Sequence, residues 1–132
     1  MPKRAPKDRK YTGEHEWILD EGNGIALIGI TDYAQEMLTD IVFVELPPPG
    51  KGVRAGQSLA VVESVKSVSE VYAPVGGVVT EVNGLLEEKP ELVNQDAYGA
   101  GWMVRLRMDD PAELSGLMDA LAYDELVAQA DH

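Results

Sequence analysis

Residues 63–70, Glu-Ser-Val-Lys-Ser-Val-Ser-Glu, place a single lysine among small polar side chains in the middle of apolar, β-branched sequence. The stretches 58–63 and 68–73 on either side have the composition of short strands. A polar segment of this length between two strands favours an antiparallel hairpin. Lys66 would lie at the tip of that hairpin.

The surroundings of Lys66 support the same geometry. Gly56 lies ten residues before it and Gly77 eleven residues after it, and glycine is typical of turns that bound a strand. We therefore expect both glycines at the base of the hairpin. No other basic residue occurs between Arg54 and Lys89, so the ammonium should be accessible to a modifying enzyme. A surface lysine that only improves solubility is the alternative.

Periodicity and turn signals predict the other elements, in a single domain over residues 11–132. We expect extended segments at residues 11–19, 25–30, 41–46, 75–82 and 102–108. A short helix near residues 32–39 should be capped by Asp32, and helices should follow Asp110 near the C-terminus. Residues 83–101 are expected to be a long connection. The prediction is a mainly β domain with minor α content, a sandwich of short antiparallel strands.

Charge is distributed unevenly along the 132 residues. The chain has 11 basic and 23 acidic residues, a net charge of −12. Residues 1–10 contain five of the basic residues, so we expect a flexible basic N-terminus ahead of an acidic body. That body should repel nucleic acid phosphates. No apolar stretch has the length of a membrane span or the form of a signal peptide.

Residue types that perform catalysis are scarce. The absence of cysteine excludes a disulfide framework and a thiolate metal site, and the only histidines are His15 and His132. A hydrolase using His15 with Glu16 is therefore disfavoured. Acids at 87, 88 and 91 are more typical of a solvated face than of a catalytic pair. We predict no metal and no catalytic residue.

Eight short blocks along residues 11–127 carry a resemblance to a known family. They are His15-Glu16-Trp17, Gly29–Gln35, Asp40–Pro47, Glu63–Ser67, Tyr72–Gly77, Glu81–Asn83, Leu92–Asn94 and Tyr98–Trp102. In this order they resemble the lipoyl/biotinyl carrier domains and, within them, the glycine cleavage system H proteins. The helix near residues 32–39 and the C-terminal helices are similar to H proteins rather than to other lipoyl domains.

The resemblance implies lipoate, joined by an amide to Lys66, as the cofactor. It also implies that the attaching enzyme recognises the tip through Glu63, Ser64, Val65 and Ser67. By motif position, Glu16 and Glu70 are candidates to hold the ammonium of the loaded arm in a cleft. The chain would be a carrier without catalysis of its own.

The implied partners are the other proteins of the system. A pyridoxal-phosphate glycine decarboxylase would load an aminomethyl group, and a tetrahydrofolate-dependent aminomethyltransferase would remove it. A dihydrolipoyl dehydrogenase would reoxidise the arm, and a lipoate ligase or an octanoyl/lipoyl transferase would attach it. We expect a cytoplasmic monomer of bacterial type, or a mitochondrial protein only if this is a processed form.

Several alternatives remain open at this point. A biotin carrier usually has its lysine between two methionines, whereas Lys66 lies between Val65 and Ser67. A β interaction module without a prosthetic group would never be acylated at Lys66. An H-like protein that relays lipoate during its assembly would have the same motifs and a different task.

Overall fold

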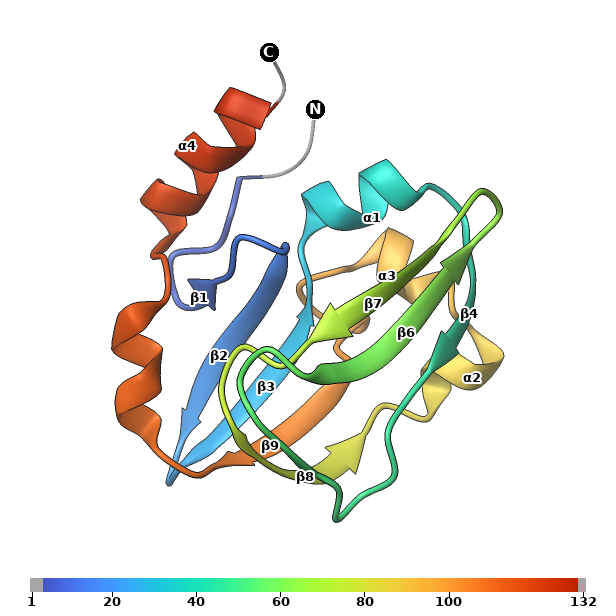
Figure 1. Ribbon diagram of the computed structural model, residues 1–132. Helices are drawn as coiled ribbons and strands as arrows, with labels where there is room; N and C mark the ends of the chain where they lie inside the picture. Colours follow the sequence, from blue (N-terminus) through green and yellow to red (C-terminus); the bar gives the residue numbers. More distant parts are fainter. Residues whose placement is uncertain (1–3, 131–132) are drawn as a thin grey trace.

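The computed structural model describes residues 4–130 as two antiparallel sheets (Figure 1). The first sheet has the strand order β1 (Lys10–Tyr11), β2 (Glu16–Gly22), β3 (Ile25–Ile30), β9 (Val104–Met108), β8 (Gly77–Val82) and β5 (Gly52–Val53). The second has the order β4 (Ile41–Glu45), β6 (Ser58–Ser64) and β7 (Val68–Tyr72). The predicted sandwich of short antiparallel strands is confirmed.

The main core lies between the two sheets. Ile28 and Leu106 from the first sheet and Val44 and Val62 from the second belong to one buried cluster. Successive side chains of a strand point to opposite faces, so each strand contributes alternate residues to this core. Burial of these apolar side chains is the main favourable contribution to folding.

The helix after β3 and the C-terminal helices occur where the sequence predicted them, whereas two further short helices were not predicted. They are α1 (Asp32–Leu38), α2 (Leu85–Glu88), α3 (Leu92–Gln95), a 3-10 helix (Pro111–Gly116) and α4 (Ala120–Ala130). The cap of α1 is Thr31, whose Oγ1 accepts the Ala34 N–H at 3.2 Å, and not Asp32 as predicted. Asp32 lies one residue too late, already inside the first turn. The expected connection at 83–101 contains α2 and α3.

A second buried cluster lies on the other face of the first sheet, beneath α4, which runs along one edge of the molecule (Figure 1). Tyr11, Trp17 and Tyr123 are almost fully buried there, and the rings of Tyr11 and Tyr123 stack with centroids 4.9 Å apart. Trp17 lies directly over Gly29, where an added Cβ would come within 2.7 Å of the indole. Gly29 therefore allows the large ring to lie flat on the sheet.

Part of the basic N-terminal segment that the sequence predicts to be flexible contacts this cluster, through Ala5 and Arg9. The Ala5 N–H donates to Asp124 Oδ1 at 3.1 Å. The Arg9 guanidinium lies 4.6 Å from the centre of the Trp17 ring and donates to the Tyr98 carbonyl at 3.0 Å. A cation over an aromatic face is attractive, which explains why this part of the basic segment is held. Residues 1–3 lie outside the described residues.

The predicted glycine pair is only half correct. Gly56, with φ +87°, donates its N–H to the Ala73 carbonyl at 2.8 Å at the base of the β6–β7 hairpin. Gly77 instead belongs to β8 of the other sheet, where it pairs with Val53. The chain crosses between sheets after residue 73, which the spacing could not indicate.

Candidate functional site

Lys66 lies in the turn between β6 and β7, at the tip of the hairpin on the side of the molecule opposite α4 (Figure 1). The last cross-strand pair is Glu63 with Val68. Beyond it, the Ser64 N–H donates to the Ser67 carbonyl at 2.8 Å, and Ser64 Oγ accepts the N–H groups of Ser67 and Lys66 at 3.1 and 3.3 Å. One serine hydroxyl therefore shapes the turn that presents Lys66.

The side chain of Lys66 makes no hydrogen bond and no ion pair with any residue in the range 4–130. Over the same range, the ion pairs are Arg9 with Asp8 and Arg105 with Glu21 and Glu81. The residue is exposed, as are Val65 and Ser67, and Glu63 and Ser64 are half-buried. The tip therefore offers an amine that an enzyme can reach without displacing a partner.

The tip is also held from the side by the loop between α1 and β4. The Val65 N–H donates to the Asp40 carbonyl at 3.0 Å. Asn94 holds the residues on both sides of Asp40, because its Nδ2 donates to the Thr39 carbonyl at 2.6 Å and its Oδ1 accepts the Ile41 N–H at 3.0 Å. Sequence reasoning missed this arrangement. An asparagine in an apolar stretch of the 83–101 connection was the one available signal.

Glu16 is buried, with 2% of its surface exposed. Because Trp17 faces α4, the adjacent Glu16 faces the second sheet. Its Oε1 accepts the Thr12 hydroxyl at 2.5 Å and its Oε2 accepts the Tyr72 N–H at 3.0 Å. Burial raises the pKa of the Glu16 carboxyl, and the Thr12 hydrogen bond partly opposes this shift. This carboxylate joins β2 of one sheet to β7 of the other.

Glu70 lies in the middle of β7, two residues before Tyr72, and is exposed. It stands opposite Val61 in the sheet, and its carboxylate is 3.4 Å from the Tyr72 hydroxyl. Tyr72 comes four residues after Val68, which is about 14 Å at ~3.4 Å per strand residue. The structure therefore places the buried Glu16 carboxylate at the end of β7 that is distant from Lys66, and the accessible Glu70 in the middle of that strand.

The weaker catalytic candidates do not come together. His15 Nδ1 lies 2.8 Å from the Tyr123 hydroxyl, whereas the Glu16 carboxylate is bonded to Thr12 and Tyr72. His15 has φ +72°, and burial lowers the pKa of its imidazole. The acids at 87, 88 and 91 are exposed. Within residues 4–130, no three side chains of the metal-binding types gather at one point.

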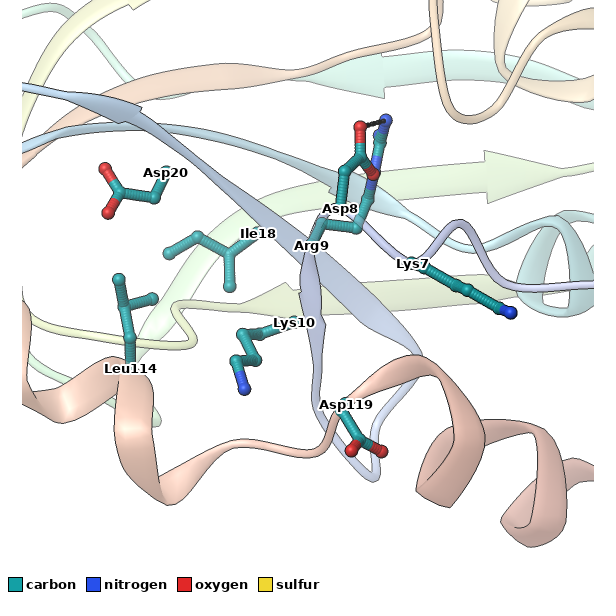
Figure 2. Close-up of a pocket in the computed structure, with 8 residues that line it drawn as sticks. All are labelled: Lys7, Asp8, Arg9, Lys10, Ile18, Asp20, Leu114 and Asp119. Carbon is teal, nitrogen blue, oxygen red and sulfur yellow. Dashed lines mark hydrogen bonds and ion pairs between the residues drawn. The ribbon is translucent and has the colours of Figure 1, made fainter.

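A shallow cavity of about 220 Å³ lies between the N-terminal segment, β2 and the 3-10 helix (Figure 2). Its lining residues are Lys7, Asp8, Arg9, Lys10, Ile18, Asp20, Leu114 and Asp119. The charges of both signs are interspersed, and Asp8 is already paired with Arg9 at 2.8 Å. None of these residues belongs to the lysine hairpin, so we place the functional site at the tip and not in this cavity. No helix in the described part of the chain is long and apolar enough to cross a membrane.

A sandwich of two small antiparallel sheets that presents one unpaired lysine at a hairpin tip has the architecture of a lipoyl-type carrier domain. The family model described as Glycine cleavage H-protein matches residues 9–130. The chain therefore belongs to the glycine cleavage H-protein family, whose members are lipoyl-carrying shuttle proteins. As a member, it works with the other components of the glycine cleavage system.

Individual relatives agree over nearly the whole chain. A glycine cleavage system H protein of Thermus thermophilus is 56% identical over 122 residues, covering 92% of this chain and 94% of the relative. One from Aeromonas hydrophila is 53% identical, covering 92% and 95%. The crystal structure of a glycine cleavage system H protein from Mycobacterium marinum superimposes with a TM-score of 0.83 at 38% identity. That match covers 97% of this chain and all of the other.

Proposed function

We propose that Lys66 is the single attachment site of lipoate, and that the loaded chain carries an aminomethyl group from the glycine decarboxylase to the aminomethyltransferase. One observation carries this proposal. Lys66 is the lysine at the tip of the β6–β7 hairpin, exposed and without a hydrogen bond or ion pair to residues 4–130. When bound, the dithiolane of lipoate supplies reversible thiol–disulfide chemistry and a sulfur that can carry the one-carbon unit.

The residues present at the tip fit this group. Acylation requires the neutral Lys66 amine to attack an activated acyl carbon, so that a C–N bond forms, the bond to the activating group breaks, and the amine proton passes to solvent. Ser64 fixes the turn, and the Asp40 carbonyl holds the Val65 N–H. Glu63, Ser64, Val65 and Ser67 are the residues that a lipoate ligase or an octanoyl/lipoyl transferase would meet first. A rigid turn presents the amine in one orientation.

The chain is proposed to act without a catalytic residue of its own, in the cytoplasm and as a monomer. Its partners are the pyridoxal-phosphate decarboxylase, the tetrahydrofolate-dependent aminomethyltransferase and the flavin-dependent dihydrolipoyl dehydrogenase. A net charge of −12 favours rapid, salt-sensitive encounters with basic docking surfaces.

Glu16 at the far end of β7 and Glu70 in the middle of that strand are proposed to border the cleft that shelters the arm. Glu70 offers an accessible carboxylate for a cationic group. Glu16 is bonded to Thr12 and Tyr72, so its proposed role is to support the cleft by fixing the start of β2 against the end of β7, in place of holding the ammonium itself. The length of about 14 Å from Val68 to Tyr72 is matched better by an extended lipoyl-lysyl arm than by a bare lysine side chain.

Acylation of Lys66→Arg tests the assignment. Arginine keeps the charge and the exposure, so stability should change by no more than about 0.5 kcal/mol, whereas a lipoate ligase should incorporate no lipoate. Peptide mass spectrometry of wild type and variant gives the readout. Lipoate on Lys51 or Lys89 of the variant would contradict a unique site.

A further inference from the structure

The outer face of the β4–β6–β7 sheet exposes apolar side chains beside Lys66. Seven large hydrophobic side chains are exposed among the residues that the structure describes. Four of them, Val42, Phe43, Val65 and Val68, lie on the hairpin tip or on the strand next to it, with exposures from 45% to 66%. We call these four residues the tip patch. A cluster of this kind is typical of an interaction surface.

The register shows that the patch is continuous with the tip. Phe43 pairs with Glu63, and Glu63 pairs with Val68, so these three side chains form one row across the sheet and share a face. The next row on that face contains Glu45, Val61 and Glu70. Apolar and acidic side chains therefore alternate over the surface next to the lysine.

A β-bulge creates half of the patch. Ile41 pairs with Ser64 and Phe43 with Glu63, so two steps along β4 match one step along β6, and Val42 is the extra residue. Ile41 and Val44 are buried, while both residues between them are exposed. Strict alternation would have turned one of the two inward. A bulge redirects side chains and is frequent beside functional sites.

We propose that the tip patch is the docking platform for the enzyme that acylates Lys66, and that the contacting surface of this enzyme is apolar at its centre with lysine or arginine at its rim. The inference rests on the proposed attachment at Lys66. Two arguments select this occupant. The first is charge, because the acids of the face require a basic rim.

The second argument is reach. A bare lysine carries its amine on a stem of four carbons, so the acylating enzyme must close over the tip and cover the neighbouring residues. The finished arm extends farther from the backbone, so an enzyme that uses it requires less contact with Val42 and Phe43 than the acylating enzyme does. An acyl adenylate or an acyl thioester is the co-reactant, and the departing AMP or thiol balances the new amide.

The test measures kcat and KM of a lipoate ligase, with ATP and lipoate, on the wild-type chain and on the double variant Val42→Thr, Phe43→Thr. Threonine retains strand propensity and removes the apolar contact. We expect KM to rise about tenfold, the equivalent of losing ~1.4 kcal/mol of contact energy, with kcat within about twofold. The matched control is Leu121→Gln, which removes an apolar side chain that is 70% exposed on α4, and its KM should equal that of wild type.

A charge-reversed variant, Glu45→Lys, tests the basic rim. Its KM should also rise, and the difference from wild type should shrink at high salt, because screening weakens contacts between exposed charges. Thermal unfolding of every variant confirms that the fold is retained.

Three results would overturn the inference. The first is an unchanged ligase KM in the double variant. The second is a rise in KM confined to the decarboxylase or the dehydrogenase when the variant is supplied already lipoylated, since the patch would then belong to that partner. The third is a wild-type dimer in sedimentation that the double variant abolishes, since a second copy would then cover the patch. If wild type itself takes no lipoate at Lys66, the proposed function fails together with the inference.

Discussion

The hairpin tip and the cluster beneath α4 each place one cation beside apolar side chains. The two cations differ in the number of contacts that they make. Arg9 lies 4.6 Å from the Trp17 ring, donates to the Tyr98 carbonyl and pairs with Asp8. Lys66 has none of these contacts with residues 4–130 and stands between two exposed residues, Val65 and Ser67. The contacts of Arg9 with Trp17 and Tyr98 hold the N-terminal segment to the domain, whereas its pair with the adjacent Asp8 lies within that segment. The absence of such bonds at Lys66 leaves its amine available for chemistry.

The comparison teaches that stability and function occupy separate parts of this domain. The cluster beneath α4 closes one face of the first sheet with aromatic side chains. The tip is shaped by backbone hydrogen bonds and by small polar side chains, with little buried apolar surface. Substitutions in the first region should therefore change the free energy of unfolding. Substitutions in the second should change recognition.

The largest effect is expected for Trp17→Ala. Removing a fully buried indole should cost about 3–5 kcal/mol of unfolding free energy, because Trp17 packs between Gly29 and Arg9 and donates to the Ala97 carbonyl at 3.0 Å. Denaturant unfolding measures this loss. The ligase rate per folded molecule should stay within about twofold of wild type, and a large fall in that rate would contradict the separation of the two regions.

Glu16 joins the two regions, and its replacement should have an intermediate effect. Glu16→Ala leaves the Tyr72 N–H without its partner, at a cost of about 1–3 kcal/mol. Glu16→Gln can still accept that N–H through its amide oxygen and should cost less. Denaturant unfolding of both variants at one pH checks this order, and equal losses would show that the Tyr72 bond contributes little.

The sign of the pH effect at Glu16 follows from its raised pKa. The folded state binds a proton more readily than the unfolded state, so Glu16 makes stability fall as pH rises from its ordinary value of 4.5 through the raised pKa. Glu16→Gln removes this contribution. The stability of the variant relative to wild type should therefore improve as pH rises through that interval, and a constant difference would argue against an elevated pKa.

Asn94→Ala should affect the tip from a distance. The substitution releases the Thr39 carbonyl and the Ile41 N–H, and so loosens the Asp40 carbonyl that holds the Val65 N–H. We expect a loss of about 1–2 kcal/mol, faster hydrogen exchange at Val65, and ligase kcat/KM lower by about tenfold.

Asn83→Ala is the matched control for that variant. Asn83 likewise bonds the backbone twice through its side-chain amide, donating to the carbonyls of Ala100 and Trp102, both at 2.8 Å. It should lose similar stability and keep the wild-type kcat/KM. Equal losses of kcat/KM in the two variants would assign the Asn94 effect to stability alone.

His15 should produce the smallest effect, visible as a pH dependence. Burial lowers the pKa of its imidazole, while Glu14 opposes the shift, so below pH 6.5 the unfolded chain binds a proton that the folded chain resists. This contribution to stability is complete above pH 6.5 and is lost as pH falls below it. Asparagine tolerates the positive φ at this position. As the pH falls from about 7 to about 5.5, the free energy of unfolding of His15→Asn should therefore decrease less than that of wild type. The measurement is denaturant unfolding of both proteins across this pH range. If the free energies of unfolding of wild type and variant change with pH in parallel, His15 does not titrate in this way.

Much of the β architecture was predictable because local signals agree with the final fold. Residues 41–46 combine β-branched residues with a proline stop, and β4 forms there. The lysine hairpin was predictable from strand composition and from the polar turn. Thr31 was overlooked as the α1 cap, because Asp32 is an equally good cap by residue type and lies only one position later.

The remaining features depend on contacts between distant residues. α2 and α3 have four residues each, which is too short for a helical period to be visible. The burial of Glu16 depends on β7 passing next to β2, and the bulge at Val42 depends on the register with β6. No local pattern indicates either. The candidate site was therefore predictable at Lys66 itself, while the groups that position it were not.

The most direct test of the central claim is intact and peptide mass spectrometry of the protein purified from its native host. We predict the added mass of one lipoyl group, located on the peptide that contains Lys66, and no modification at Lys51 or Lys89. A biotinyl mass at Lys66, a lipoyl group on another lysine, or an unmodified chain in cells that are actively cleaving glycine would contradict the account.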